Sequence, residues 1–178
     1  MKILTFLFIA IFSLTLTQST LQAEECSQCP MPSPKIAPEF NRLKELVGTW
    51  KGSTKMQGKD QEIMVEYQLT SGGSTLVEHL FKGTPHEMVS VYYSVGEKVF
   101  MTHYCMLGNQ PHLQLEKAKD NTLEFSLADP SGLQSKNEIH MHALALTFTD
   151  KNSIVQKWTG FENGKPKEST TINLSRVQ

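Results

Sequence analysis

Four side chains of the kinds that bind metals recur in pairs along this sequence. His103 and Cys105 lie two residues apart in one apolar run, and His140 and His142 lie two apart in a later one. If both runs are strands, each pair shares a face, because side chains alternate between the two faces of a strand. Brought together, three imidazoles and a thiolate would form a tetrahedral zinc set. The three histidines alone would leave a position open for water, the arrangement of catalytic zinc.

The same side chains have two other interpretations. His103, Tyr104, His140 and His142 would orient a bound molecule if they point into an enclosed pocket. His103 and Tyr104 point to opposite faces of their strand, so at most one of them can line such a pocket. Alternatively, the histidines are structural and Cys105 is an inert buried thiol. No residue is assigned a catalytic role, because the sequence holds no nucleophile-elbow, phosphate-loop or His-Glu-x-x-His motif.

A second pair of cysteines, Cys26 and Cys29, lies near the N-terminus in a C-x-x-C arrangement. We expect a local disulfide, because such a pair oxidises in an exported protein. Three prolines follow within five residues, which disfavours the helix that activates a redox pair. Capture of a metal or partner and redox activity remain the alternatives.

The first 23 residues have the layout of a secretory signal peptide. Lys2 supplies a positive start, residues 3–16 are almost continuously apolar, and a more polar stretch ends at Ala23. The alternative, a retained membrane anchor, is disfavoured because the apolar run is shorter than the roughly 20 residues of a spanning helix. We therefore expect cleavage near Ala23 and a periplasmic or secreted bacterial protein without a transmembrane anchor after processing.

The composition is that of one globular domain. The chain has 178 residues, of which 39% are hydrophobic and 20% charged, and its formal net charge is -1. This balance excludes a disordered chain and offers no electrostatic basis for binding nucleic acid.

After a flexible Cys- and Pro-rich arm at 24–37, a barrel domain is expected over 38–178. Apolar residues first recur at helical spacing in 38–47, and the period then changes to two. The predicted strands are 48–53, 61–70, 75–82, 88–95, 99–107, 112–117, 122–128, 138–149, 154–161 and 168–174. Ten antiparallel strands with short connections predict an all-β, up-and-down barrel, since closure removes sheet edges, with a flattened sandwich as the alternative.

A family resemblance appears at Leu46-Val47-Gly48-Thr49-Trp50, where a short helix leads into Gly-x-Trp. This arrangement resembles the calycin group, which includes lipocalins and the ten-stranded nitrobindin-like haem proteins. Segments 83–88 and 102–111, with His140-Met141-His142, resemble bacterial exported lipocalin-like domains of unassigned function. The resemblance covers about residues 40 to 175 and implies that Trp50 plugs one end of a barrel. Nitrobindin-like proteins bind haem through a histidine near the C-terminus, whereas no histidine follows His142 here.

We expect a barrel that binds a small apolar or amphipathic molecule, because a ten-stranded barrel has more internal room than its own side chains fill. One alternative is a zinc or haem protein, or a metal-dependent enzyme, that uses His103, His140 and His142. Another is an interaction domain that forms a homodimer through strand 138–149. On that strand the face of His140 is expected to continue with Leu144, Leu146 and Phe148.

Overall fold

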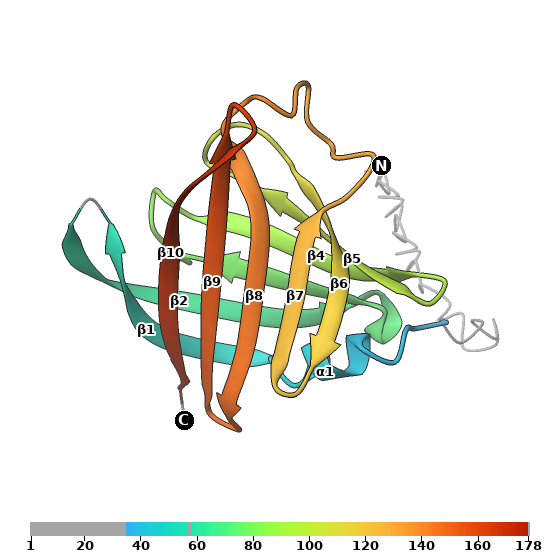
Figure 1. Cartoon of the computed structure of the whole chain (residues 1–178). Coiled ribbons are helices and arrows are strands. Elements are labelled where there is room, and N and C mark those ends of the chain that lie inside the picture. The colour runs from blue at the N-terminus through green and yellow to red at the C-terminus, as the bar shows by residue number, and fades with distance from the viewer. Residues whose placement is uncertain (1–34, 57, 178) are drawn as a thin grey trace, which may run out of the picture. The chain divides into compact units, whose positions relative to one another are not determined.

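The computed structural model describes residues 35–56 and 58–177, which form ten strands and very little helix (Figure 1). The helical elements are α1 (Phe40–Lys44) and the 3₁₀ turn η1 (Ser71–Gly73). The strands are β1 (Gly48–Met56), β2 (Lys59–Thr70), β3 (Thr75–Leu80), β4 (Met88–Val95), β5 (Lys98–Tyr104), β6 (His112–Lys119), β7 (Thr122–Leu127), β8 (His140–Asp150), β9 (Ser153–Glu162) and β10 (Lys165–Arg176).

The strands form a closed antiparallel barrel. Each strand pairs with its neighbours in the sequence, and β10 closes the ring by pairing with β1, Trp50 lying opposite Arg176. The predicted all-β up-and-down barrel with a short N-terminal helix is confirmed, and the flattened sandwich is not the architecture. Because the barrel is closed, each strand pairs with a neighbour on both sides, and the sheet has no free edge.

Helix α1 is shorter than the predicted segment 38–47. Its last turn tightens into i to i+3 bonds, in which the amides of Leu46 and Val47 bond to the carbonyls of Leu43 and Lys44 at 3.0 and 3.2 Å. Gly48 then adopts φ 125, a conformation that L side chains rarely reach, and this turns the chain into β1. In the part of the chain that is described, no helix is long and apolar enough to cross a bilayer.

One end of the barrel is closed by α1 and the turn that follows it (Figure 1). Leu43 and Leu46 are fully buried there, and the indole Nε1 of Trp50 donates to the Leu46 carbonyl at 2.7 Å. The Arg176 guanidinium lies 4.2 Å from the Trp50 ring and donates to the carbonyls of Val47 and Glu45, each at 2.6 Å. The beginning of the domain is thus tied to the end of the last strand.

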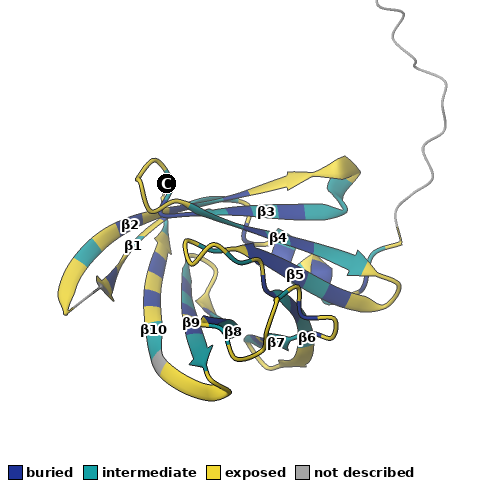
Figure 2. Ribbon diagram, turned by 90° about the horizontal axis from the view of Figure 1, so that it is seen from above, coloured by how far each residue is buried: buried dark blue, intermediate teal, exposed yellow. Residues whose placement is uncertain are grey.

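Burial alternates along the strands, as it must when one face of each strand points into the barrel. Figure 2 shows the alternation along β10, where Ile172 and Leu174 are buried and Thr171 and Asn173, each directly before one of them, are exposed. The last residues of the predicted flexible arm also touch the barrel. Ala37 is 1% exposed, and its amide donates to the Ser94 hydroxyl at 3.2 Å.

Candidate functional site

A carboxylate lies at the centre of the barrel. Glu78 of β3 has no solvent-exposed surface and accepts hydrogen bonds from three strands. The Tyr67 hydroxyl donates to its Oε1 at 2.7 Å, and the Tyr92 hydroxyl donates to its Oε2 at 3.1 Å. The Gln156 amide donates to Oε1 and to the Tyr67 oxygen, and the Trp158 indole donates to the Gln156 carbonyl at 3.0 Å.

This interior network is held together by hydrogen bonds and not by opposite charges. Among the described residues no lysine, arginine or histidine forms an ion pair with Glu78. Burial, and then the negative charge of Glu78, raise the pKa of both Tyr67 and Tyr92 well above its usual value. Both phenols therefore stay protonated and act as donors to the carboxylate.

Beside this network, His103 points inward from the end of β5. It is 1% exposed, its Nδ1 lies 3.0 Å from the Ser90 hydroxyl, and its ring centre lies 4.7 Å from that of Trp158. Burial lowers the pKa of His103 to about 4. The imidazole is therefore neutral near pH 7, because its charged form would lack hydration.

A cavity of about 110 Å³ lies next to His103. Its wall is apolar apart from His103, Trp158 and one threonine. The lining residues are Leu80, Phe81, Met88, His103, Met141, Trp158, Thr170 and Ile172. They come from the end of β3 and the loop after it, the start of β4, the end of β5, and from β8, β9 and β10. The end of β3, the start of β4 and the end of β5 lie at the opposite end of the barrel from α1 (Figure 1). The closed end is thus plugged, and the cavity occupies the other end.

Phe81, which begins the loop between β3 and β4, forms part of the cavity wall. It is 4% exposed and has φ 58, a left-handed conformation that is unfavourable for a bulky residue. The Thr84 hydroxyl donates to the Phe81 carbonyl at 2.8 Å and holds the turn. The loop thus places an aromatic ring over the cavity at some conformational cost.

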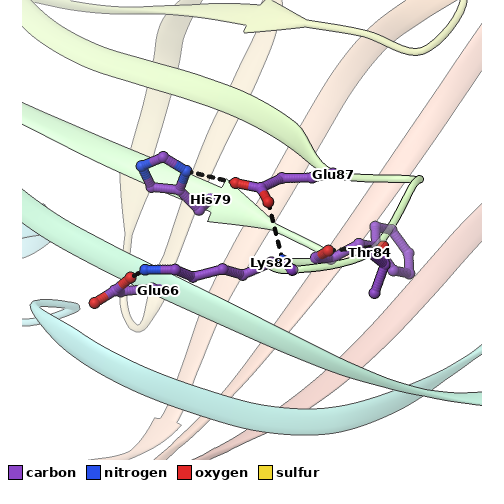
Figure 3. A network of polar contacts seen from close by, with 7 residues as sticks. Glu66, His79, Lys82, Thr84 and Glu87 are labelled. Carbon is purple, nitrogen blue, oxygen red and sulfur yellow. Dashed lines mark hydrogen bonds and ion pairs between the residues drawn. The ribbon is translucent and has the colours of Figure 1, made fainter.

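Charged side chains fasten this loop to the outside of the barrel (Figure 3). Glu87 accepts a hydrogen bond from the Gly83 amide at 2.9 Å, and its other oxygen lies 2.8 Å from Nδ1 of His79. These two contacts, the backbone amide first, lower the pKa of the Glu87 carboxyl. Lys82 pairs with Glu66 of β2. Both flanks of the Phe81 turn are therefore anchored to strands.

Of the two ligand-contacting candidates on β5, only His103 faces the interior. Tyr104 is 50% exposed and lies on the outer face. Side chains alternate between the two faces of a strand, so His103 and Tyr104 had to point in opposite directions. The closed barrel determines that His103 is the one that lies inside.

A bulge in β8 sets the positions of the other two histidines. His140 lies opposite Phe161 and Met141 opposite Gly160, after which a register shift leaves His142 without a cross-strand partner. Residues opposite each other share a face. Met141 lines the interior cavity, so His140 lies on the outer face with Phe161.

The expectation that the face of His140 continues with Leu144, Leu146 and Phe148 is therefore wrong. The bulge adds one residue to β8, so two residues separate the inward-facing Met141 from the next inward-facing residue, Leu144. His140 is therefore on the opposite face from Leu144. Neither His140 nor His142 lines the cavity.

His140 and His142 form a pair on the outer face. Nε2 of His140 lies 3.1 Å from Nδ1 of His142, and Nδ1 of His140 lies 2.7 Å from the Glu138 carbonyl. The His142 ring stacks on Phe161 with 3.7 Å between ring centres. Burial and the nearby His140 lower the pKa of His142. The pair forms a small aromatic cluster on the wall, separated from the cavity by β8.

The structure does not gather the four proposed metal ligands. His103 faces the interior, His140 and His142 face outward, and Cys105 follows the end of β5. Within residues 35–56 and 58–177, no three His, Cys, Asp or Glu side chains form a group that could hold a metal ion. Cys105 is a free thiol whose pKa is raised, chiefly by burial, which makes it a weaker nucleophile. Cys26 and Cys29 lie outside the described residues.

Strand β8 offers no free edge for the proposed homodimer, because it pairs with β7 on one side and β9 on the other. Contact through this strand would have to use its outer face, where Ala143 and Ala145 are half-buried.

Sequence reasoning missed the central network of Glu78, Tyr92 and Gln156. One signal was present for Glu78, because it lies between Leu76 and Leu80 at the apolar positions of its strand. A glutamate at an apolar position of a strand either interrupts the alternation of apolar and polar residues or is buried with its apolar neighbours. The convergence of its three donors from β2, β4 and β9 depends on barrel closure and has no local signal.

Comparison with known proteins supports the fold alone. No protein-family model and no curated protein matches this sequence. One similar solved structure is a protein of unknown function from the DUF3598 family of Nostoc punctiforme, with a TM-score of 0.50, 14% identity and coverage of 76% of this chain and 49% of that one. The chain thus spans about half the length of that protein. A redesigned β-barrel matches with a TM-score of 0.36, 12% identity and coverage of 76% and 94%. The closed ten-stranded barrel fits a lipocalin-like fold.

Proposed function

We propose that this protein is an exported binding protein of the lipocalin-like type that holds a small apolar or amphipathic molecule inside the barrel. The observation that carries the proposal is the cavity beside His103, which has an apolar wall and one neutral imidazole. Burial of the apolar surface of the ligand would supply most of the binding free energy, and the imidazole would orient it.

The size of the cavity limits what fits. At about 110 Å³ it is somewhat smaller than an engineered cavity of about 150 Å³ that binds benzene. We therefore expect the bound group to be no larger than a single ring or the end of an aliphatic chain. A larger ligand requires displacement of Phe81, which already has an unfavourable backbone conformation.

The proposal is tested first with protein purified from its natural compartment without chelator. Native mass spectrometry followed by organic extraction should show a bound organic molecule and no stoichiometric metal. In parallel, toluene titrated into the emptied protein should shift the NMR signals of Met88 and Met141 methyl groups, because both line the cavity. Absence of a bound molecule together with unchanged methyl signals would refute the binding function.

Export is the second part of the proposal, and it rests on residues 1–23, which lie outside the described part of the chain. When the full-length gene product is made in a bacterial host, the protein should appear in the periplasm or the medium. Its measured mass should be that of a chain that begins near Glu24. A full-length mass in the cytoplasmic or membrane fraction would contradict it.

A further inference from the structure

Trp158 of β9 lies where the interior network meets the cavity. Its side chain is 3% exposed and lines the cavity, and its indole Nε1 donates to the side-chain oxygen of Gln156 at 3.0 Å. Gln156 is held in turn, because its amide nitrogen donates to Glu78 and to the Tyr67 oxygen. An indole has no polar group besides this N–H. The network therefore pairs the only polar atom of the Trp158 side chain, and the rest of the ring meets the cavity as an aromatic surface.

Two further rings line the cavity from other parts of the barrel. The His103 ring lies against that of Trp158, with 4.7 Å between ring centres and 40° between ring planes, and its Nδ1 lies 3.0 Å from the Ser90 hydroxyl. Phe81 comes from the loop between β3 and β4, where its carbonyl accepts a hydrogen bond from the Thr84 hydroxyl. Three aromatic side chains, each held by its surroundings, thus form much of the wall.

Two methionines add to this wall. Met88 at the start of β4 and Met141 of β8 line the same cavity. A thioether sulfur makes favourable contacts with aromatic rings, and two rings attract each other beyond the effect of the area that they bury. Both kinds of contact are available to an aromatic ligand and not to a saturated one. The remaining lining residues, Leu80, Thr170 and Ile172, favour neither kind of ligand.

We infer that the cavity selects a molecule with an aromatic ring over a saturated molecule of the same skeleton, and that Trp158 is the main contact that determines this choice. The inference rests on the proposed binding function and narrows the ligand from apolar to aromatic. The volume of about 110 Å³ limits the bound part to a single ring. Because the network already fixes the Trp158 ring, contact with it costs little further side-chain freedom.

The first test asks whether a bound ring lies against Trp158. The chain has two tryptophans, and the other one, Trp50, lies at the closed end of the barrel, bonded to the Leu46 carbonyl. In protein labelled with 5-fluorotryptophan, toluene should shift the ¹⁹F NMR signal of Trp158 through its ring current and leave that of Trp50 in place. The inference is overturned if toluene shifts the methyl signals of Met88 and Met141 but not the Trp158 signal.

The second test compares toluene with methylcyclohexane, which has the same carbon skeleton but a saturated ring. Both are titrated while the methionine methyl signals are followed, and each affinity is divided by the partition coefficient of the compound from water into hexadecane. This correction removes the difference in hydrophobicity between the two compounds. The corrected affinity should then be roughly three- to tenfold higher for toluene.

Two substitutions of Trp158 separate aromatic contact from cavity size. Trp158→Leu and Trp158→Phe both enlarge the cavity, but only phenylalanine keeps an aromatic surface. The preference for toluene should therefore disappear in Trp158→Leu and persist in Trp158→Phe. Phe161→Leu is the matched control, because it removes a ring from the outer face of β9 and should leave the preference intact.

The outcomes separate the inference from the function on which it rests. Equal corrected affinities, or a preference that is lost in Trp158→Phe as fully as in Trp158→Leu, overturn the inference and leave the binding function standing. If neither compound binds, the binding function itself is wrong and the inference falls with it. Should Trp158→Leu fail to fold, Phe81→Leu serves in its place. It should reduce the preference about twofold or more, and an unchanged preference would overturn the inference.

Discussion

The hydrogen bond between Tyr92 and Glu78 offers a sharp test of the interior network. Tyr92→Phe keeps the ring, which packs edge-on against Phe125 with 5.8 Å between ring centres, and removes only the hydroxyl. The deletion leaves one oxygen of a fully buried carboxylate without its donor at 3.1 Å. A hydrogen bond to a charged group contributes about 1.5–3 kcal/mol, so we expect a loss of about 2 kcal/mol in the free energy of unfolding.

The second half of the test places the same change in a Glu78→Leu background. There the Tyr92 hydroxyl has already lost its acceptor, so its removal should be neutral or slightly stabilising. The two losses should differ by about 2 kcal/mol, the coupling energy of the pair. Tyr93→Phe is the matched control, because Tyr93 lies on the outer face, stacked on Phe100, and among the described residues its hydroxyl forms no hydrogen bond with the network.

Urea unfolding followed by circular dichroism measures these differences. A loss of about 2 kcal/mol lowers the midpoint by about 1 M when the slope is near 2 kcal/mol/M, and the slope itself should not change. Tyr92→Phe could instead lower the free energy of unfolding equally in both backgrounds, or by less than about 0.5 kcal/mol in the wild type. Either result would show that the hydrogen bond from Tyr92 does not stabilise the buried Glu78.

Three further predictions follow from other parts of the barrel. His103 has a pKa of about 4 when folded and an ordinary value near 6.5 when unfolded, so the unfolded chain takes up the proton first as pH falls. Stability should therefore rise between pH 4 and 6.5, and in urea unfolding the wild type should lose about 3 kcal/mol more than His103→Leu when pH is lowered through this range. Met141→Phe should abolish toluene binding by filling the cavity, whereas His142→Phe, one residue along but outside the barrel wall, should leave it unchanged in the same NMR titration. Arg176→Ala should lower the free energy of unfolding by about 2 kcal/mol, because it removes two carbonyl contacts and the stacking on Trp50, and Arg176→Lys should recover less than half of that loss.

Each of these predictions has an outcome that would contradict it. A His103→Leu variant with the same acid sensitivity as the wild type would show that other groups cause the loss. Equal effects of the two phenylalanine substitutions would show that the bulge in β8 is misplaced. Full recovery by Arg176→Lys would show that charge alone, and not the forked guanidinium, holds the closed end.

Local periodicity in the sequence was enough to predict the ten strands, the short helix and the closure into a barrel. Alternation of apolar residues depends on neighbours two apart, and a chain of antiparallel strands has few ways to bury its apolar face. The same reasoning correctly limited His103 and Tyr104 to opposite faces. These results needed no knowledge of which strands meet across the barrel.

Tertiary structure alone decided which face lies inside and what meets there. The bulge at His142 changes the inward position by one residue, and a shift of one residue moves a side chain to the other face. Glutamate is a residue type that usually lies on the protein surface. Barrel closure nevertheless brings two tyrosines and a glutamine to Glu78 from three other strands. Alternation is a local property that a sequence carries, whereas register and convergence depend on contacts between residues as far apart as Glu78 and Gln156.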